Sequence, residues 1–196
     1  MKNKFFLLLL ITLLLTGCAQ NTTSQENISI SSSENNAAES SGQETKEPYV
    51  VTFTSATIDG DAITDSVFAN SKLTMLNVWG TYCNPCLNEM PGLGEIATEY
   101  DSEEFQMFGI ICDVTTDASA SDLASAQDLI KATKATTYPH ILLNESLYYN
   151  LVGASNSVPT TYFINQKGEL VGYLVGAQSK ANWITIIDTL LAEAGE

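Results

Sequence analysis

WGTYCNPCLNEMP, residues 79–91, places two cysteines two residues apart at the start of a predicted helix. It follows a nearly continuous apolar run, residues 73–79, which is typical of a strand buried on both faces. The helix is expected over residues 84–100, so Cys83 lies at its N-terminus and Cys86 follows one turn later. Free backbone N–H groups and the macrodipole at a helix N-terminus stabilise a thiolate. The position therefore favours a reactive Cys83.

The cysteine pair has three possible explanations: half of a zinc site, a structural disulfide, or a redox pair. Structural zinc usually takes four ligands, and Cys112 and His140 are the further candidates outside the N-terminal segment. A disulfide that closes so short a loop stabilises the fold little. We therefore favour redox exchange, with Cys83 as the attacking thiolate and Cys86 as the resolving thiol. No metal ion is expected at the pair.

Hydrophobic periodicity and turn residues predict the elements that surround the pair. A hairpin turn is expected at residues 166–168, and Ser179 is the expected N-cap of the last helix. Helices that alternate with buried strands before a closing hairpin predict an α/β fold, with a mixed central sheet flanked by helices. The expected strands are residues 49–57, 73–79, 105–114, 140–143, 159–165 and 169–175, and the expected helices are residues 84–100, 120–134, 147–152 and 179 onward.

With these elements in place, WGTYCNPC (residues 79–86) resembles the active site of the thioredoxin superfamily, and more closely that of the TlpA/ResA-like thiol-disulfide oxidoreductases. The resemblance runs from about residue 49 to the C-terminus. Pro91 matches the proline at which the family's active-site helix is kinked, and Val158-Pro159 matches its cis-proline loop. The resemblance implies a thioredoxin-like fold with an N-terminal strand extension and a TlpA-type strand–helix insertion before Pro159.

The resemblance also implies the roles of individual residues. Glu89 lies three residues past Cys86, on the same helical face, where the family has an acidic residue. A carboxylate there would raise the pKa of a neighbouring thiol or exchange protons with it; the alternative is a solvated helix residue. Asn77 stands where thioredoxins carry a buried acid, which argues against a thioredoxin-style proton relay. Catalysis is assigned to Cys83, Cys86 and Glu89, and client binding to Trp79, Tyr82, Asn84, Pro85, Val158 and Pro159.

Three further side chains bear on the site. Cys112 falls in a predicted buried strand, so we expect it to be a small apolar core residue. His140 begins another predicted strand, and we expect a structural rather than a catalytic role for it. Trp79 would serve both the core and the wall of the site.

The N-terminal segment predicts export. Lys2 and Lys4 precede an apolar run over residues 5–15, which fits the h-region of a signal peptide. Leu15-Thr16-Gly17-Cys18 then resembles the lipobox of bacterial lipoproteins. We expect residues 1–17 to be a lipoprotein signal peptide and Cys18 to carry the lipid; an ordinary secretory signal with an incidental cysteine is the alternative. The protein is therefore expected at the extracytoplasmic face of the membrane.

The next segment changes in composition. Residues 18–48 are rich in Ser, Asn, Gln, Thr and Glu and poor in large apolar residues, so they are expected to form a disordered tether. Residues 49–196 are then the thioredoxin-like domain. The formal net charge is −15 and arginine is absent, which argues against nucleic acid and anionic lipid headgroups as partners.

The function expected from the resemblance is the reduction of disulfides or oxidised sulfur centres in exported client proteins. The redox-active pair Cys83–Cys86 needs no further cofactor. A CcdA/DsbD-type membrane protein is the expected electron donor, and apocytochrome c, a methionine sulfoxide reductase or a peroxidase are possible clients. Alternatives are a disulfide-forming oxidase, a peroxiredoxin, which the absence of arginine disfavours, and a non-enzymatic binding lipoprotein.

Overall fold

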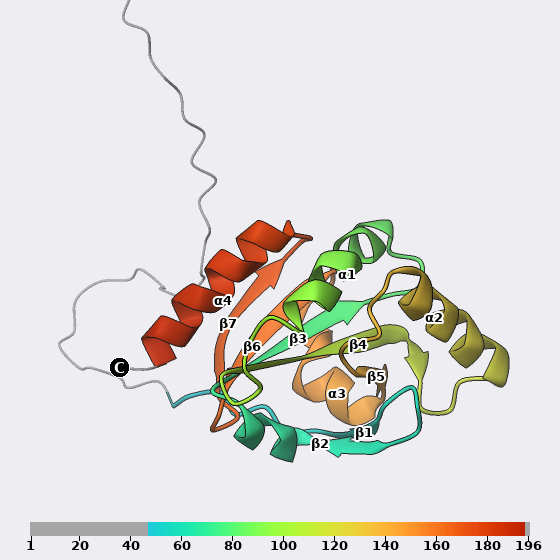
Figure 1. Ribbon diagram of the computed structural model, residues 1–196. Coiled ribbons are helices and arrows are strands. Elements are labelled where there is room, and N and C mark those ends of the chain that lie inside the picture. Colours follow the sequence, from blue (N-terminus) through green and yellow to red (C-terminus); the bar gives the residue numbers. More distant parts are fainter. Residues whose placement is uncertain (1–46, 195–196) are drawn as a thin grey trace, which may run out of the picture.

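A computed structural model describes residues 47–194, which form a five-stranded mixed sheet with helices on both faces (Figure 1). The strand order is β5-β4-β3-β6-β7, in which β3, β4 and β5 run parallel and β6 and β7 pair antiparallel. The predicted α/β class and mixed sheet are therefore confirmed. The strands are β3 (Leu73–Trp79), β4 (Phe105–Thr115), β5 (His140–Leu143), β6 (Thr160–Asn165) and β7 (Leu170–Val175).

Helices cover both faces of the sheet (Figure 1), and an apolar cluster lies on each face. One lies under α1 (Asn84–Ile96), α2 (Ala120–Ala132) and α4 (Lys180–Ala194). The other lies under α3 (Glu145–Asn150), the short 3-10 helices η1 (Asp65–Asn70) and η2 (Val152–Ala154), and a hairpin of β1 (Thr54–Ala56) and β2 (Ala62–Thr64). Elements α2, β5 and α3 precede the cis-proline loop, in the region where the sequence predicted an insertion.

Strand β3 explains why the sequence reads as an unbroken apolar run. All seven of its residues are buried, and alternate side chains enter opposite clusters. Met75 and Trp79 join the cluster under α1, whereas Leu76 and Val78 join the cluster under α3. Burying such a side chain stabilises the fold by about 1.5–3 kcal/mol, so β3 firmly fixes the start of α1.

The prediction of one strand over residues 49–57 is wrong. Only Thr54–Ala56 is a strand, and it pairs antiparallel with β2 outside the central sheet. The segment crosses beneath the sheet from one edge to the other, because Val50 bridges Glu169 beside β7 whereas Thr57 bridges Ile141 in β5. Its alternating apolar side chains, such as Val51 and Phe53, are buried in the cluster under α3 and do not mark a paired strand. Element β2 and the 3-10 helix η1 were not predicted.

Element ends differ from the prediction by a few residues. Helix α1 ends at Ile96 rather than residue 100, because the N–H groups of Thr98 and Glu99 bind carbonyls three residues back and tighten the chain into turns. Helix α2 ends at Ala132, shortly before Lys134 adopts a φ of 57°. The predicted cap of α4 is confirmed, since Ser179 Oγ accepts a hydrogen bond from the backbone N–H of Asn182 at 3.2 Å.

Helix α3 also begins earlier than predicted. It spans Glu145–Asn150 rather than residues 147–152, because the side chain of Asn144 caps it by accepting a hydrogen bond from Leu147 N–H at 3.0 Å. The 3-10 helix η2 follows it. Strands β6 and β7 each begin one residue later than predicted, and Gly168 adopts a φ of 81° in the turn between them.

The predicted signal peptide (residues 1–17), the lipidation of Cys18 and the tether (residues 18–48) fall almost wholly on residues 1–46, outside the described part of the chain. Glu47 and Pro48 are exposed and belong to no helix or strand. Between residues 47 and 194, no helix combines the length and the hydropathy that a membrane span requires.

Candidate active site

A disulfide joins Cys83 and Cys86 at the N-terminus of α1, directly after β3. Cys83 is the N-cap residue, and its Sγ accepts a hydrogen bond from Cys86 N–H at 3.2 Å. Cys83 keeps 5% of its surface exposed, whereas Cys86 is completely buried. Cys83 is therefore the sulfur that an incoming group reaches first, and the backbone donor at the helix start is aimed at it.

The loop that presents Cys83 is anchored to the neighbouring strand. The carboxylate of Asp113, near the end of β4, accepts hydrogen bonds from the backbone N–H of Thr81 at 3.0 and 3.1 Å and from its hydroxyl. The backbone N–H of Cys83 also binds Gly80 O at 3.0 Å. These contacts tie the segment between β3 and α1 in place. Nothing in the sequence pointed to Asp113.

The predicted client-binding residues around the disulfide differ in how far their side chains are exposed. Tyr82 is 68% exposed, and Asn84 and Pro85 are also exposed, so all three are available to a client. Pro85 occupies the first turn of α1, where its missing N–H costs no helical hydrogen bond. Trp79 is completely buried and supports the site from within the core.

The loop before β6 carries a cis peptide bond between Val158 and Pro159, as the resemblance implied. Val158 is half-buried and packs against both apolar clusters, one of which contains Cys83 and Cys86. The carbonyl of Pro159 accepts a hydrogen bond from Gly176 N–H at 2.8 Å, which fixes the loop to the end of β7.

Glu89 is buried, with 6% of its surface exposed, so the alternative of a solvated helix residue is wrong. Its Oε1 accepts a hydrogen bond from Asn77 Nδ2 at 3.0 Å. Its Oε2 accepts hydrogen bonds from Gln178 N–H at 3.0 Å and from Trp183 Nε1 at 3.2 Å. Donors from β3, the β7–α4 loop and α4 thus hold one carboxylate beneath the active-site helix.

Burial raises the pKa of Glu89 above its ordinary value of 4.5. The hydrogen bonds from Gln178, Asn77 and Trp183 act in the opposite direction and partly offset the shift. Asn77 Nδ2 also donates to Thr161 Oγ1 at 3.0 Å, which connects Glu89 to strand β6. Two polar atoms in this interior, Asn77 Oδ1 and the hydroxyl of Tyr138, have no hydrogen-bond partner among the described residues.

Asn77, predicted to differ from the buried acid of thioredoxins, thus serves as a donor to the acid on α1. The sequence did not reveal the roles of Gln178 and Trp183. Trp183 is a buried residue of α4, and Gln178 contributes its backbone N–H. No local sequence pattern connects either residue to the cysteine pair, because the contact depends on how α4 packs against α1.

His140 has a structural environment, as expected. Its Nδ1 accepts a hydrogen bond from Trp79 Nε1 at 3.1 Å, and its Nε2 lies 2.9 Å from Ala135 O, so Nε2 carries the proton. Burial lowers the pKa of His140 to about 4, and the ring is neutral at physiological pH. The pair of rings fixes Trp79 behind the cysteines.

Replacing Gly109 by alanine is expected to disrupt this pair. A Cβ there would clash with His140 Nδ1 and lie 3.0 Å from Trp79 Nε1, with no flexible side chain to yield. Overpacking of this kind typically costs about 1–3 kcal/mol, and we expect the upper end of that range. Denaturant unfolding measures the loss. Gly172→Ala is the control, because nothing lies within 4 Å of the position that its Cβ would take, and it should change the free energy of unfolding by less than about 0.5 kcal/mol.

The prediction that Cys112 is a small buried core residue is wrong. It is a half-buried free thiol near the end of β4, and its Sγ lies 3.9 Å from the hydroxyl of Tyr82. Its side chain packs against the cluster under α3 and also lines a cavity, so it is only partly covered. Among residues 47–194, no three His, Cys, Asp or Glu side chains cluster in a way that could hold a metal ion.

Comparison with known proteins agrees with this geometry. Thioredoxin-like protein YneN of Bacillus subtilis is 29% identical over 119 residues, which cover 57% of this chain and 61% of YneN. Thiol-disulfide oxidoreductase ResA of Oceanobacillus iheyensis is 30% identical over 106 residues, which cover 54% of this chain and 50% of ResA. The matches thus span less than two thirds of either relative.

A crystal structure of a thioredoxin family thiol:disulfide interchange protein from Chlorobium tepidum superposes with a TM-score of 0.61. It is 24% identical, and the match covers 74% of this chain and 98% of that one. The similarity shows that the fold is thioredoxin-like, as predicted, and the relatives confirm the predicted ResA-like resemblance. The AhpC/TSA family profile matches residues 48–172, well over half of the chain. The protein is therefore a member of the AhpC/TSA family.

Proposed function

We propose that the protein is a thiol-disulfide oxidoreductase that exchanges electrons between Cys83–Cys86 and the disulfides of client proteins. One observation carries the proposal: a disulfide caps α1, with Cys83 slightly exposed and Cys86 completely buried. A disulfide placed for stability alone would gain little from so short a loop. The named relatives, a thioredoxin-like protein and a thiol-disulfide oxidoreductase, support the same chemistry.

The reaction begins with both cysteines reduced. The thiolate of Cys83, stabilised by the N-terminus of α1, attacks one sulfur of the client disulfide; a mixed disulfide forms and the second client sulfur leaves as a thiolate. Cys86, once deprotonated, attacks the Cys83 sulfur and releases the first client sulfur. The client gains two electrons and two protons, and the Cys83–Cys86 disulfide remains.

Glu89 is the proposed proton partner of Cys86 in the second step. It lies on the same face of α1 three residues further on, and the Cys86 thiol is buried away from water. A buried carboxylate with a raised pKa can take the thiol proton and release it later. The ionised form would also raise the pKa of the neighbouring thiol, because two negative charges are costly in the same buried region.

Client contacts are proposed for the exposed rim and the cis-proline loop. Tyr82, Asn84 and Pro85 are exposed beside the disulfide, and Val158-Pro159 forms the neighbouring loop. Trp79 contributes indirectly, since it is held by His140 within the core. A client bound there in an extended conformation could pair with backbone groups of the loop.

The setting of the reaction is proposed from the N-terminal sequence. The apolar run followed by Leu15-Thr16-Gly17-Cys18 supports export and lipid attachment at Cys18, with residues 18–48 as the tether. Exported proteins with disulfides would then be the clients, such as apocytochrome c, a methionine sulfoxide reductase or a peroxidase. A CcdA/DsbD-type membrane protein would return electrons to the pair.

We expect the pair to act as a reductant. The reduction potential, measured by equilibration of the full chain with glutathione buffers and thiol alkylation, should lie well below about −200 mV. A value near about −120 mV would instead support a disulfide-forming oxidase. Cys83→Ser provides the control, since it removes the dithiol couple and should show no two-electron transition.

A further inference from the structure

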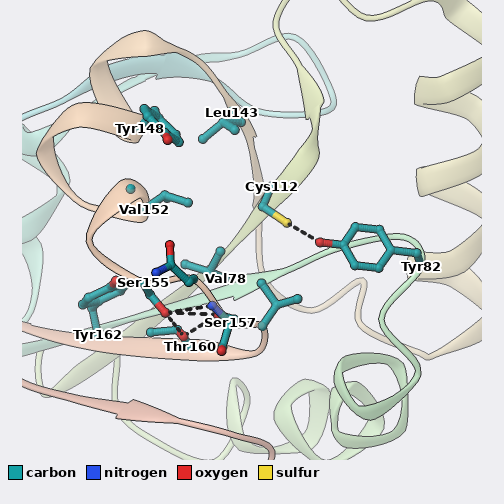
Figure 2. A pocket seen from close by; sticks show the side chains of 13 residues that line it. Val78, Tyr82, Cys112, Leu143, Tyr148, Val152, Ser155, Ser157, Thr160 and Tyr162 are labelled. Carbon is teal, nitrogen blue, oxygen red and sulfur yellow. Dashed lines mark hydrogen bonds between the residues drawn. The ribbon is translucent and has the colours of Figure 1, made fainter.

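A cavity of about 230 Å³ opens between Tyr82 and the cis-proline loop (Figure 2). Figure 2 shows Cys112 and Tyr82 on one side of it, with Tyr148, Val152 and Thr160 on the other. The cavity does not include Glu89 or either cysteine of the disulfide, so it is distinct from the buried interior beneath α1. The apolar and aromatic part of its lining comes from Val78, Leu143, Tyr148, Val152, Val158 and Tyr162.

Several polar groups of the lining already have hydrogen-bond partners. Ser155 Oγ and Thr160 Oγ1 lie 2.8 Å apart, and the Thr160 hydroxyl donates to Ser157 O at 2.7 Å. The hydroxyl of Tyr162 donates to Leu151 O at 3.3 Å. Burial raises the pKa of the Cys112 thiol, which keeps it neutral. Asn156 and the hydroxyls of Tyr82 and Tyr148 add uncharged polar groups to the lining, which contains no charged side chain. An occupant therefore meets mainly apolar and aromatic surfaces, and a charged group would lose hydration without an oppositely charged partner.

The cavity adjoins the active site along the chain. Tyr82 directly precedes Cys83, and Val158 directly precedes Pro159, so both flank any polypeptide that is joined to Cys83. The volume is below the roughly 300–1,000 Å³ of sites for drug-sized molecules. It suits a single side chain rather than a cofactor.

The sheet face beyond the cavity is also apolar. Thr160 pairs with Val175 and Tyr162 with Tyr173, so the side chains of Tyr173 and Val175 share the face that lines the cavity. Tyr173 is 46% exposed and Val175 is 51% exposed. An extended apolar segment could therefore continue from the cavity across β6 and β7.

We propose that this cavity receives an uncharged apolar or aromatic side chain that lies next to the reacting cysteine of the client. The inference rests on the proposed exchange at Cys83 and names its substrate class: disulfides whose cysteine has a large apolar neighbour. Tyr82 and Val158 line the cavity next to Cys83 and Pro159 in the chain, and Tyr148 lies across the cavity from Tyr82.

Two disulfide-linked peptides test the proposal. They are identical except that Phe or Asn stands next to the cysteine, and both residues are neutral, so the acidic net charge of the protein affects them equally. The second-order rate of reduction by the reduced full chain should be about tenfold higher for the Phe peptide, a typical discrimination by a hydrophobic pocket. Tyr148→Ala should lower this ratio at least threefold. Val171→Ala, which removes an exposed apolar side chain of β7 outside the cavity, should leave the ratio unchanged.

The outcomes separate the two proposals. If the wild-type protein reduces both peptides at equal rates, or if Tyr148→Ala leaves the ratio intact, the cavity does not select clients, although thiol exchange at Cys83 stands. If the wild-type protein reduces neither peptide, the proposed function is wrong and the inference falls with it. The Asn peptide also serves as a folding control. A misfolded variant would reduce both the Phe and the Asn peptide more slowly, without a specific change in the ratio of the two rates.

Discussion

Cys83→Ser is expected to lower the rate of client disulfide reduction by about 1,000-fold or more, because a serine hydroxyl cannot replace the attacking thiolate. Cys83 is the outer sulfur at the start of α1, and the completely buried Cys86 cannot reach a protein disulfide in its place. The measurement is the steady-state reduction of a disulfide-linked fluorescent peptide by the full chain, with a chemical reductant to recycle the pair.

Cys86→Ser provides the comparison. It should retain the first attack, seen as one burst of released client thiol, and lose the turnover that follows, because no resolving thiol remains. Equal loss of the burst in both variants would indicate a folding defect or a different nucleophile. Substantial turnover by Cys83→Ser would contradict the assignment of Cys83 as the attacking residue.

Glu89→Leu is expected to destabilise the protein by roughly 3 kcal/mol, although leucine is similar in size and suits a buried position. The change removes an acceptor from three donors: Asn77 Nδ2 and Trp183 Nε1, which are buried, and the backbone N–H of Gln178, which is partly buried. Asn77 keeps its bond to Thr161, which limits the loss at that donor. Denaturant unfolding measures the effect. Glu103→Leu, at an exposed position, is the control and should cost much less.

Glu89→Leu should also change how the free energy of unfolding depends on pH. A carboxyl with a raised pKa binds its proton more tightly in the folded state than in the unfolded chain. As the pH rises above 4.5, the unfolded chain loses this proton first, so the free energy of unfolding falls until the folded Glu89 also ionises. Glu89→Leu removes this fall, whereas Glu103→Leu retains it.

His140 titrates in an overlapping range with the opposite sign. Its pKa is lowered from 6.5 to about 4 in the folded state, so stability is gained as the pH rises through that interval. The contribution of Glu89 must therefore be taken from the difference between the wild-type and variant profiles. If the free energies of unfolding of the wild-type protein and Glu89→Leu differ by an amount that does not change with pH above 4.5, a raised pKa for Glu89 is contradicted.

The sequence predicted the elements whose signals are local. The buried run of β3, the cysteine pair at the start of α1 and the Ser179 cap each follow from neighbouring residues. The resemblance added the cis bond before Pro159. The segment at residues 49–57 was mispredicted because alternation reports which side chains are buried, and burial beneath a sheet gives the same pattern as pairing within it.

The interior of the site depended on contacts between distant elements. Glu89 could be placed on the helical face of Cys86, but its burial follows from how α4 brings Trp183 and the preceding loop against α1. Cys112 was mispredicted because its apolar neighbours suggest full burial, whereas a cavity next to the cluster under α3 leaves the thiol half-exposed. The cavity itself is formed by residues from separate segments of the chain, so no single stretch could predict it.

Mass spectrometry of the mixed disulfide formed by Cys86→Ser tests the proposed exchange at its defining step. The reduced variant is mixed with a disulfide-linked peptide, quenched with acid, alkylated and digested. The account predicts one peptide per chain, attached to Cys83 and released by a reductant, with Cys112 recovered in its alkylated form. Attachment at Cys112, or no attached peptide at all, would contradict it.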